Sequence, residues 1–334
     1  MTADQPTSPL DTGHLTKLVA SLQSPFGWPQ RSDDYTLAST WVRERSGSSF
    51  FHLTGRPNGP DVVVKTVKGW SHQDAQAHYE AMADLARIIE EAGLDDAGGI
   101  RPLAWSPVPS MLVMPYVEGL DMVSILRQPA HPAWKGELES WMGRAGAMLA
   151  IFHRRHHTQP RDDISAAANE ARDLAQRLRL DASVVELLLE LVDWRHRCSG
   201  SFGDFGPGNL HATPEGRLYL LDPPDAPVTA LIHRDLANFL FELRRQLAGR
   251  GFTRHRAIPG HIDRFRRAFL DGYSAHHQEG SLAAPDEGLI ALFEMRRSVG
   301  MARKRFPRRP GDAIWFARSA LARRREVLRA GGQS

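Results

Sequence analysis

The sequence is poor in the features that mark extracellular or membrane proteins. Cys198 is the one cysteine among 334 residues, so an internal disulfide is excluded. No apolar run approaches the length that spans a bilayer. Residues 1–11 lack the basic-then-apolar pattern of a signal peptide. With 42% apolar and 24% charged residues, the chain has an ordinary globular composition, and we expect a cytoplasmic protein.

Internal repeats and long low-complexity tracts are also absent. The net charge is only +3, but residues 286–330 hold 12 Lys or Arg against 5 Asp or Glu. These basic residues are not interleaved with aromatics as in a nucleic-acid-binding module, so we expect no nucleic-acid partner. Two interpretations remain, namely solvated helix faces or a surface that favours an anionic partner.

The first part of the chain predicts strands with one helix among them. Residues 1–32 show little periodicity and predict an N-terminal extension. Strands are predicted at 40–42, 50–53, 61–65, 100–105 and 111–117. Ser71 and Asp74 form a capping-box pattern, which predicts that a helix starts between the third and fourth strands.

The rest of the chain predicts helices around one hairpin. Apolar residues recur at helical spacing in 141–152, 236–243 and 262–273, and 184–194 is apolar on several sides, which predicts a well-buried helix. The only strand-like stretches are 209–213 and 217–222, on either side of a Pro-Glu-Gly turn. We therefore expect an extension at 1–32, a strand-rich lobe at 33–119 and a helical lobe at 120–334.

One segment points to chemistry more directly than any other. Gly203–Asn209 reads Gly-Asp-Phe-Gly-Pro-Gly-Asn, and Asp222 follows Asn209 by thirteen residues, at the end of an apolar strand. Phosphoryl transfer uses such a set: one Asp accepts the proton of an attacking hydroxyl, while an Asn and a second Asp hold Mg²⁺ against nucleotide phosphates. The segment resembles the catalytic loop and metal-binding strand of the aminoglycoside phosphotransferase and choline kinase family, relatives of the protein kinases.

The resemblance implies a fold, an activity and cofactors. The fold is bilobed, protein-kinase-like and α+β, with a small five-stranded antiparallel N-lobe and a mainly helical C-lobe. The activity is transfer of the γ-phosphate of ATP or GTP, with Mg²⁺, to a hydroxyl. Asp204 would be the catalytic base, and Asn209 and Asp222 would be the metal ligands. Asp235 would cap a helix of the large lobe and steady the loop.

The resemblance also implies nucleotide-binding residues in the first lobe. Lys65 ends the third predicted strand and would reach the α/β-phosphates, steadied by Glu80 on the following helix. Lys68 and Asp74 are the alternatives for this pair. The turn that would cover the phosphates consists of Ser46, Gly47, Ser48 and Ser49. Small residues let the backbone approach a phosphate, and their N–H groups and hydroxyls can donate to it.

A third nucleotide contact is expected at the hinge between the lobes. Pro115, Tyr116 and Val117 follow the fifth predicted strand, and their backbone would bond the adenine edge. Because Pro115 has no N–H, the donor must lie elsewhere in this segment.

Two departures from the family pattern bear on activity. Phe202 stands where the family usually has His, and packing of its ring would replace the support that this His gives the loop. Pro223 and Pro224 follow the metal-binding Asp and should exclude Asp222 from the right-handed helical region. An enzyme is favoured because the polar residues that the reaction needs are all present, namely Lys65, Asp204, Asn209 and Asp222. A nucleotide-binding regulatory pseudokinase is the alternative.

The acceptor is less well defined than the reaction. Basic pairs and triplets at Arg296-Arg297, Arg303–Arg305 and Arg308-Arg309 favour a neutral or anionic acceptor, such as a sugar, sugar phosphate or glycan, over a cationic aminoglycoside.

The C-terminal residues 314–325 leave two interpretations open. They can form a helix packed on the large lobe, or lie on the inner face of a membrane and serve a lipid-linked glycan acceptor. His153, His156 and His157 lack matching metal ligands and are interpreted as a solvated helix end.

Overall fold

We describe the protein from a computed structural model of the whole chain. The described residues are 35–43, 47–55, 60–67, 69–107, 110–128, 131–157, 164–192, 197–224, 226–248, 259–277, 282–305 and 310–332. The predicted extension at 1–32 lies outside them. By contacts the chain divides into two compact units: Met1–Arg87 with Gly99–Glu118, and Ile88–Gly98 with Gly119–Ser334.

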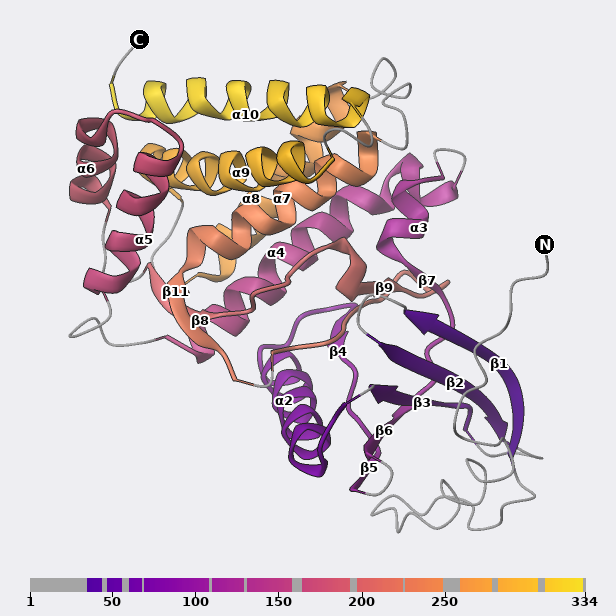
Figure 1. Ribbon diagram of the computed structural model, residues 1–334. Coiled ribbons are helices and arrows are strands. Elements are labelled where there is room, and N and C mark those ends of the chain that lie inside the picture. The colour runs from indigo at the N-terminus through magenta and orange to yellow at the C-terminus, as the bar shows by residue number, and fades with distance from the viewer. Residues whose placement is uncertain are drawn as a thin grey trace. The chain divides into compact units, whose positions relative to one another are not determined.

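The first unit is built on an antiparallel sheet of five strands in the order β1-β2-β3-β6-β5. The strands are Tyr35–Arg43 (β1), Ser48–Gly55 (β2), Val62–Val67 (β3), Ala104–Pro107 (β5) and Ser110–Pro115 (β6). In register, Phe51 lies opposite Val64 and Val64 opposite Val113, and all three are buried in one apolar cluster. The predicted five-stranded sheet is thus confirmed (Figure 1).

A long helix, α2 (His72–Glu91), follows β3. The predicted capping box is present, since the Ser71 N–H donates to the Asp74 carboxylate at 2.7 Å and the Asp74 N–H donates to Ser71 Oγ at 3.2 Å. The predicted apolar face is also confirmed, with Met82, Leu85 and Ile89 almost fully buried.

The second unit is mainly helical. Its helices are α3 (Met122–Leu126), α4 (Glu137–Arg155), α5 (Ile164–Arg177), α6 (Ala182–Leu191), α7 (Ile232–Ala248), α8 (Pro259–His276), α9 (Ala284–Arg305) and α10 (Pro310–Ala330), with short 3-10 turns at Pro132–Lys135 (η2) and Pro207–Asn209 (η4). A small sheet has the order β4-β10-β9-β7, from Ala97–Gly99 (β4), Leu218–Leu220 (β10), Leu210–Ala212 (β9) and Leu120–Asp121 (β7). Cys198–Ser201 (β8) and Val228–Leu231 (β11) form a two-stranded sheet.

Helices α4 and α8 pack with their backbones in close contact. A Cβ atom on Gly146 of α4 would lie 2.0 Å from the Phe269 carbonyl oxygen of α8, and one on Gly272 would lie 2.0 Å from the Gly143 carbonyl oxygen. Only glycine permits this approach. The contact fixes the helix that carries His153 against the helix that carries Tyr273, two residues of the site described below.

The C-terminal helix belongs to the helical unit. In Figure 1 α10 runs alongside α9, and Phe316 of α10 is buried and stacked on Phe241 of α7, with ring centroids 5.8 Å apart. Arg323 of α10 pairs at 3.3 Å with the fully buried Glu294, which also accepts from Arg244 at 3.0 Å. The packed-helix interpretation therefore fits this segment. No helix in the described part of the chain is long and apolar enough to cross a membrane.

Three expectations for the helical half need correction. Strands β8 and β11 were not predicted, because a strand of four residues with small or mixed side chains carries no clear alternation. Helix α6 is not buried all round, since Leu191 is 58% exposed. His153 does not lie at a solvated helix end: it is buried on the inner side of α4, and its ring is hydrogen-bonded on both nitrogens.

Candidate functional site

The loop after β8 is fixed by one buried carboxylate. Asp235, in the first turn of α7, is fully buried. It accepts four hydrogen bonds, from Ser201 Oγ at 2.9 Å, Phe202 N at 2.6 Å, Gly203 N at 2.9 Å and His153 Nε2 at 3.1 Å. Three of the four donors belong to the chain entering the Gly203–Asn209 loop. The expectation that Asp235 steadies this loop agrees with its contacts.

A relay of buried polar groups supports Asp235 in turn. His153 Nδ1 lies 2.9 Å from the Tyr273 hydroxyl, which joins α4, α7 and α8 in one chain of hydrogen bonds. Burial raises the pKa of Tyr273 well above its usual value, so the hydroxyl stays protonated. Sequence reasoning missed this role of His153. Its spacing with Trp141 and Phe152 on the apolar side of one helix was the available signal.

The loop is held from a second side by Asn238 and by packing. Asn238, one turn after Asp235 on α7, donates to the carbonyl oxygens of Gly203 at 3.2 Å and Phe205 at 3.1 Å. The buried Phe202 ring meets Phe152 and Phe205 edge-on, with centroids 5.1 and 5.2 Å apart. Packing of Phe202 thus supports the loop, as its replacement of the family's His predicted.

Asp204 sits at the tip of this rigid support and is itself exposed. Gly203, directly before it, has φ +79°, a left-handed conformation that favours glycine and turns the chain outwards. The combination presents a carboxylate to solvent on a backbone that cannot easily move. A fixed, accessible carboxylate can orient a hydroxyl and accept its proton.

Asn209 and Asp222 both lie at the open end of the β9–β10 hairpin. The Leu221 N–H donates to the Asn209 carbonyl oxygen at 2.8 Å, one step beyond the Leu220–Leu210 pair, so Asp222 is the next residue along. The Asn209 side-chain amide also donates to the Asp204 carbonyl oxygen at 3.0 Å. The backbone thus places the three polar residues predicted from the motif on one loop and the adjoining hairpin end, and their roles stay predictions.

Asp222 has an unusual backbone. Its φ is +50°, in the left-handed region that non-glycine residues rarely occupy. Pro223 excludes the right-handed helical region, as predicted, but the residue takes the left-handed conformation and not an extended one. Such a conformation costs about 1 kcal/mol or more and often marks functional residues.

The donor set at the hairpin end fits Mg²⁺. With Nδ2 of Asn209 turned to the loop, its Oδ1 remains as an oxygen ligand, and Asp222 supplies a carboxylate. Among the described residues no group of three or more His, Cys, Asp or Glu side chains could hold a metal ion. Two oxygen ligands from the protein suit Mg²⁺, which keeps water and phosphate oxygens in its remaining positions.

In the first unit, Lys65 lies beside His78. Lys65 is 5% exposed, and its Nζ is 3.1 Å from His78 Nε2 and 5.5 Å from the Trp70 ring centroid. Glu80, the partner predicted for Lys65, is exposed and accepts a hydrogen bond from Gln76 at 2.8 Å. The helical repeat explains this, because a residue two positions after the inward-facing His78 points away from the sheet.

The other predicted nucleotide contacts can be placed only in part. Ser46 lies outside the described residues. Gly47 has φ +63°, and Ser48 and Ser49 already belong to β2, opposite the end of β1. At the predicted hinge the Tyr116 N–H donates to the Asp61 carbonyl oxygen at 2.9 Å. The Tyr116 ring stacks on His52, with centroids 3.8 Å apart.

Val117 directly precedes Glu118, the last residue of the first unit. Pro115 is the last residue of β6, opposite Val62 of β3. The predicted hinge segment Pro115–Val117 thus leaves the sheet from β6, which lies between β3 and β5.

Comparison with known proteins places the fold. No family model matches the chain, and no curated protein matches it in sequence. Among solved structures it is similar to the AMP-bound complex of spectinomycin phosphotransferase APH(9)-Ia, with a TM-score of 0.50 and 12% identity over 98% of this chain and 99% of that one.

Two further structural matches were found. One is an ethanolamine kinase from Plasmodium vivax, with a TM-score of 0.49 and 9% identity over 91% of this chain and 85% of that one. The other is the choline kinase LicA from Streptococcus pneumoniae, with a TM-score of 0.43 and 14% identity over 89% and 94% of the two chains. The chain has the protein-kinase-like α+β fold of the aminoglycoside phosphotransferases and choline kinases.

Proposed function

We propose that the protein is a phosphotransferase that moves the γ-phosphate of ATP or GTP to a hydroxyl of a small molecule or carbohydrate. One observation carries the proposal: an exposed Asp204 on a loop fixed by a buried carboxylate, next to an Asn–Asp pair at a hairpin end. A structural loop needs no such exposed, rigidly supported carboxylate. Phosphoryl transfer depends mostly on positioning and charge neutralisation, which this arrangement serves.

Each residue of the loop and hairpin has a role in this proposal. Asp204 orients the acceptor hydroxyl and takes its proton as the bond to phosphorus forms. Asn209 and Asp222 would hold Mg²⁺, which when bound neutralises charge on the nucleotide phosphates. Asp235 contacts neither substrate nor metal and keeps the loop in place.

The nucleotide would be held by residues 33–119 and the acceptor by residues 120–334. Lys65 is proposed to bind the α/β-phosphates, and we assign its steadying to His78 on the strength of their 3.1 Å contact. Ser46 to Ser49 are proposed to cover the phosphates, and Pro115 to Val117 to contact the adenine edge. Glu80 stays an exposed residue of α2 in this assignment.

The experiment is a thermal-shift measurement with ATP and GTP, each with and without Mg²⁺, followed by a screen for ADP or GDP release with hydroxylated acceptors. A Mg²⁺-dependent rise in Tm and acceptor-stimulated release would support the proposal. A rise in Tm without release on any acceptor would favour a regulatory pseudokinase. No rise with either nucleotide would contradict nucleotide binding and the proposal with it.

A further inference from the structure

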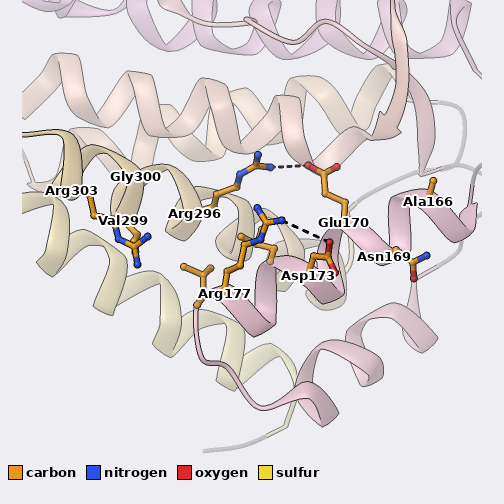
Figure 2. A pocket seen from close by; sticks show the side chains of 11 residues that line it. Ala166, Asn169, Glu170, Asp173, Arg177, Arg296, Val299, Gly300 and Arg303 are labelled. Atoms are coloured by element: carbon orange, nitrogen blue, oxygen red, sulfur yellow. Dashed lines mark hydrogen bonds and ion pairs between the residues drawn. The ribbon is translucent and has the colours of Figure 1, made fainter.

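A cavity in the helical unit is lined by opposite charges with arginine in excess. It has a volume of about 530 Å³ and lies between α5 and α9 (Figure 2). The charged residues that line it are Glu170, Asp173, Arg177, Arg296 and Arg303. Cavities of this size commonly hold a small metabolite.

The carboxylates near this cavity are shared between arginines. Glu170 accepts from Arg296 at 2.7 Å, and Arg234 of α7 approaches the same oxygen to 4.0 Å. Figure 2 shows the Arg296 and Glu170 side chains pointing toward each other, joined by this ion pair. A guanidinium group has five N–H donors, so one shared carboxylate leaves most of them for another acceptor.

Arg297, the next residue of α9, also shares its carboxylate partner with another arginine. Arg297 lies 3.8 Å from Glu242, but that carboxylate is already bonded by Arg245 through its Nε at 2.7 Å and through its Nη2. The Arg297 guanidinium also lies over the Phe241 ring, 5.9 Å from its centroid. Around Glu170 and Glu242 there are therefore four arginines for two carboxylates. We call Arg234, Arg296 and Arg297 the arginine cluster.

The arginine cluster is connected electrostatically to the proposed catalytic base. Burial lowers the pKa of Arg297, the charges of Glu242 and Asp204 raise it in part, and Arg234 and Arg296 lower it further. Arg297 follows the cavity residue Arg296 on α9 and does not itself line the cavity. Its partner Glu242 reaches the loop that carries Asp204, since a Cβ atom on Gly206 would lie 3.7 Å from Glu242 Cγ. Placing like charges together at partial burial costs stability, which is typical of a binding site.

We propose that the arginine cluster is the acceptor subsite for an anionic group, so that the acceptor is a hydroxylated small molecule carrying a phosphate or carboxylate. This inference rests on the proposed function and names its substrate class. The anionic group binds Arg296 and Arg297, and the rest of the molecule presents a hydroxyl to Asp204. Arginine suits this role because its planar fork binds phosphate or carboxylate through two parallel hydrogen bonds.

The charge pattern also argues against a cationic acceptor. An ammonium group in this cavity would face Arg177, Arg296 and Arg303, and like charges brought together cost binding energy. Glu170 and Asp173 offset this only in part, since each already contacts an arginine. The site therefore selects by charge as well as by size.

Four six-carbon probes test the proposal: glucose, glucosamine, glucose 6-phosphate and, as the carboxylate form, gluconate. Binding is measured by calorimetry on the full chain, with and without saturating Mg-ADP, so that the probe cannot be counted at the nucleotide-phosphate site. The variants are Arg297→Gln and Arg296→Gln. Arg264→Gln is the matched control, because Arg264 is on α8 and pairs with Glu139 of α4, and neither residue lines the cavity.

The expected result is that an anionic probe binds more tightly than glucose and that glucosamine binds most weakly. Arg296→Gln and Arg297→Gln should each lower the affinity for the anionic probe about tenfold, because charge-assisted hydrogen bonds are lost. Arg264→Gln should leave the affinity for the anionic probe within about twofold of the unmodified protein. Raising the salt concentration should reduce the difference in affinity between the anionic probe and glucose.

Three outcomes would overturn the proposal while leaving nucleotide binding intact. One is equal binding of glucose and its anionic forms. Another is anion binding that neither arginine variant changes, which would mean an adventitious ion only. The third is an Arg297→Gln variant that loses Mg-ADP affinity with unchanged anion binding. Failure of the proposed function would look different, as loss of any Mg²⁺-dependent nucleotide binding in the unmodified chain.

Discussion

Replacing Asp235 by Asn should destabilise the helical unit and release the loop that carries Asp204. The amide oxygen of Asn can still accept from Ser201 and Gly203, and His153 can change tautomer to accept from the new NH₂ group. The Phe202 N–H cannot adapt and would face a donor in a buried site. An unsatisfied buried donor costs about 1–3 kcal/mol, and the loss of charge from the other bonds adds about 1 kcal/mol or more.

We therefore expect Asp235→Asn to lower the free energy of unfolding by about 3 kcal/mol. For a unit of this size that corresponds to a Tm lower by about 10 °C. Tryptophan fluorescence during urea unfolding measures the change, with Asp204→Asn as the control, because Asp204 is exposed and should shift stability by at most about 0.5 kcal/mol. If Asp235→Asn unfolded at the same urea concentration as the unmodified protein, the loop would not depend on this carboxylate.

Three further predictions follow from the structure. Gly146→Ala should lower the free energy of unfolding by about 1–3 kcal/mol through its clash with α8, whereas Gly260→Ala, which meets no atom within 4 Å, should not. His78→Ala should weaken Mg-ATP binding more than Glu80→Ala, because His78 contacts Lys65; equal effects in calorimetry would refute this. His233 and Asp286 both have lowered pKa values in the folded protein. The urea concentration at the unfolding midpoint should therefore fall as the pH drops below about 6.5 and again below about 4. A midpoint that does not change with pH would contradict this prediction.

Acidification should destabilise the protein through both His233 and Asp286. Burial lowers the pKa of His233, so the unfolded chain binds a proton first as the pH falls. His233 and Arg197, at 2.8 and 2.7 Å from the Asp286 carboxylate, hold its pKa well below the usual value against the opposing effect of burial. Both groups therefore contribute stability at high pH that is lost on acidification.

Much of the fold could be predicted because local sequence patterns and tertiary packing agree. The capping box at Ser71 and Asp74, the apolar face of α2 and the β9–β10 hairpin are all local features, and each is present. Strands β8 and β11 pair over a long separation in sequence, Cys198 with Leu231, and their four residues each are too short for a periodic signal. Such strands are specified by tertiary contacts.

The site residues that lie in one short segment could be predicted from the sequence. Those that distant helices contribute could not. The Asp204–Asn209 spacing and the hairpin lie close in sequence, so the motif gave their proximity. His153 approaches Asp235 from a helix 82 positions away, and a lone histidine on an amphipathic helix shows no sign of such a partner. The position of Arg297 beside Glu242 likewise depends on how α9 packs on α7.

The most direct test of the central claim separates binding from transfer in the Asp204→Ala variant. Mg-ATP binding is measured by calorimetry, and turnover by ADP release with an acceptor that the unmodified protein uses. We predict that Mg-ATP affinity stays within about threefold while turnover falls by at least about a hundredfold, the contribution typical of a positioned general base. A folded Asp204→Ala protein that retains full turnover, or that loses Mg-ATP binding, would contradict the role assigned to this carboxylate.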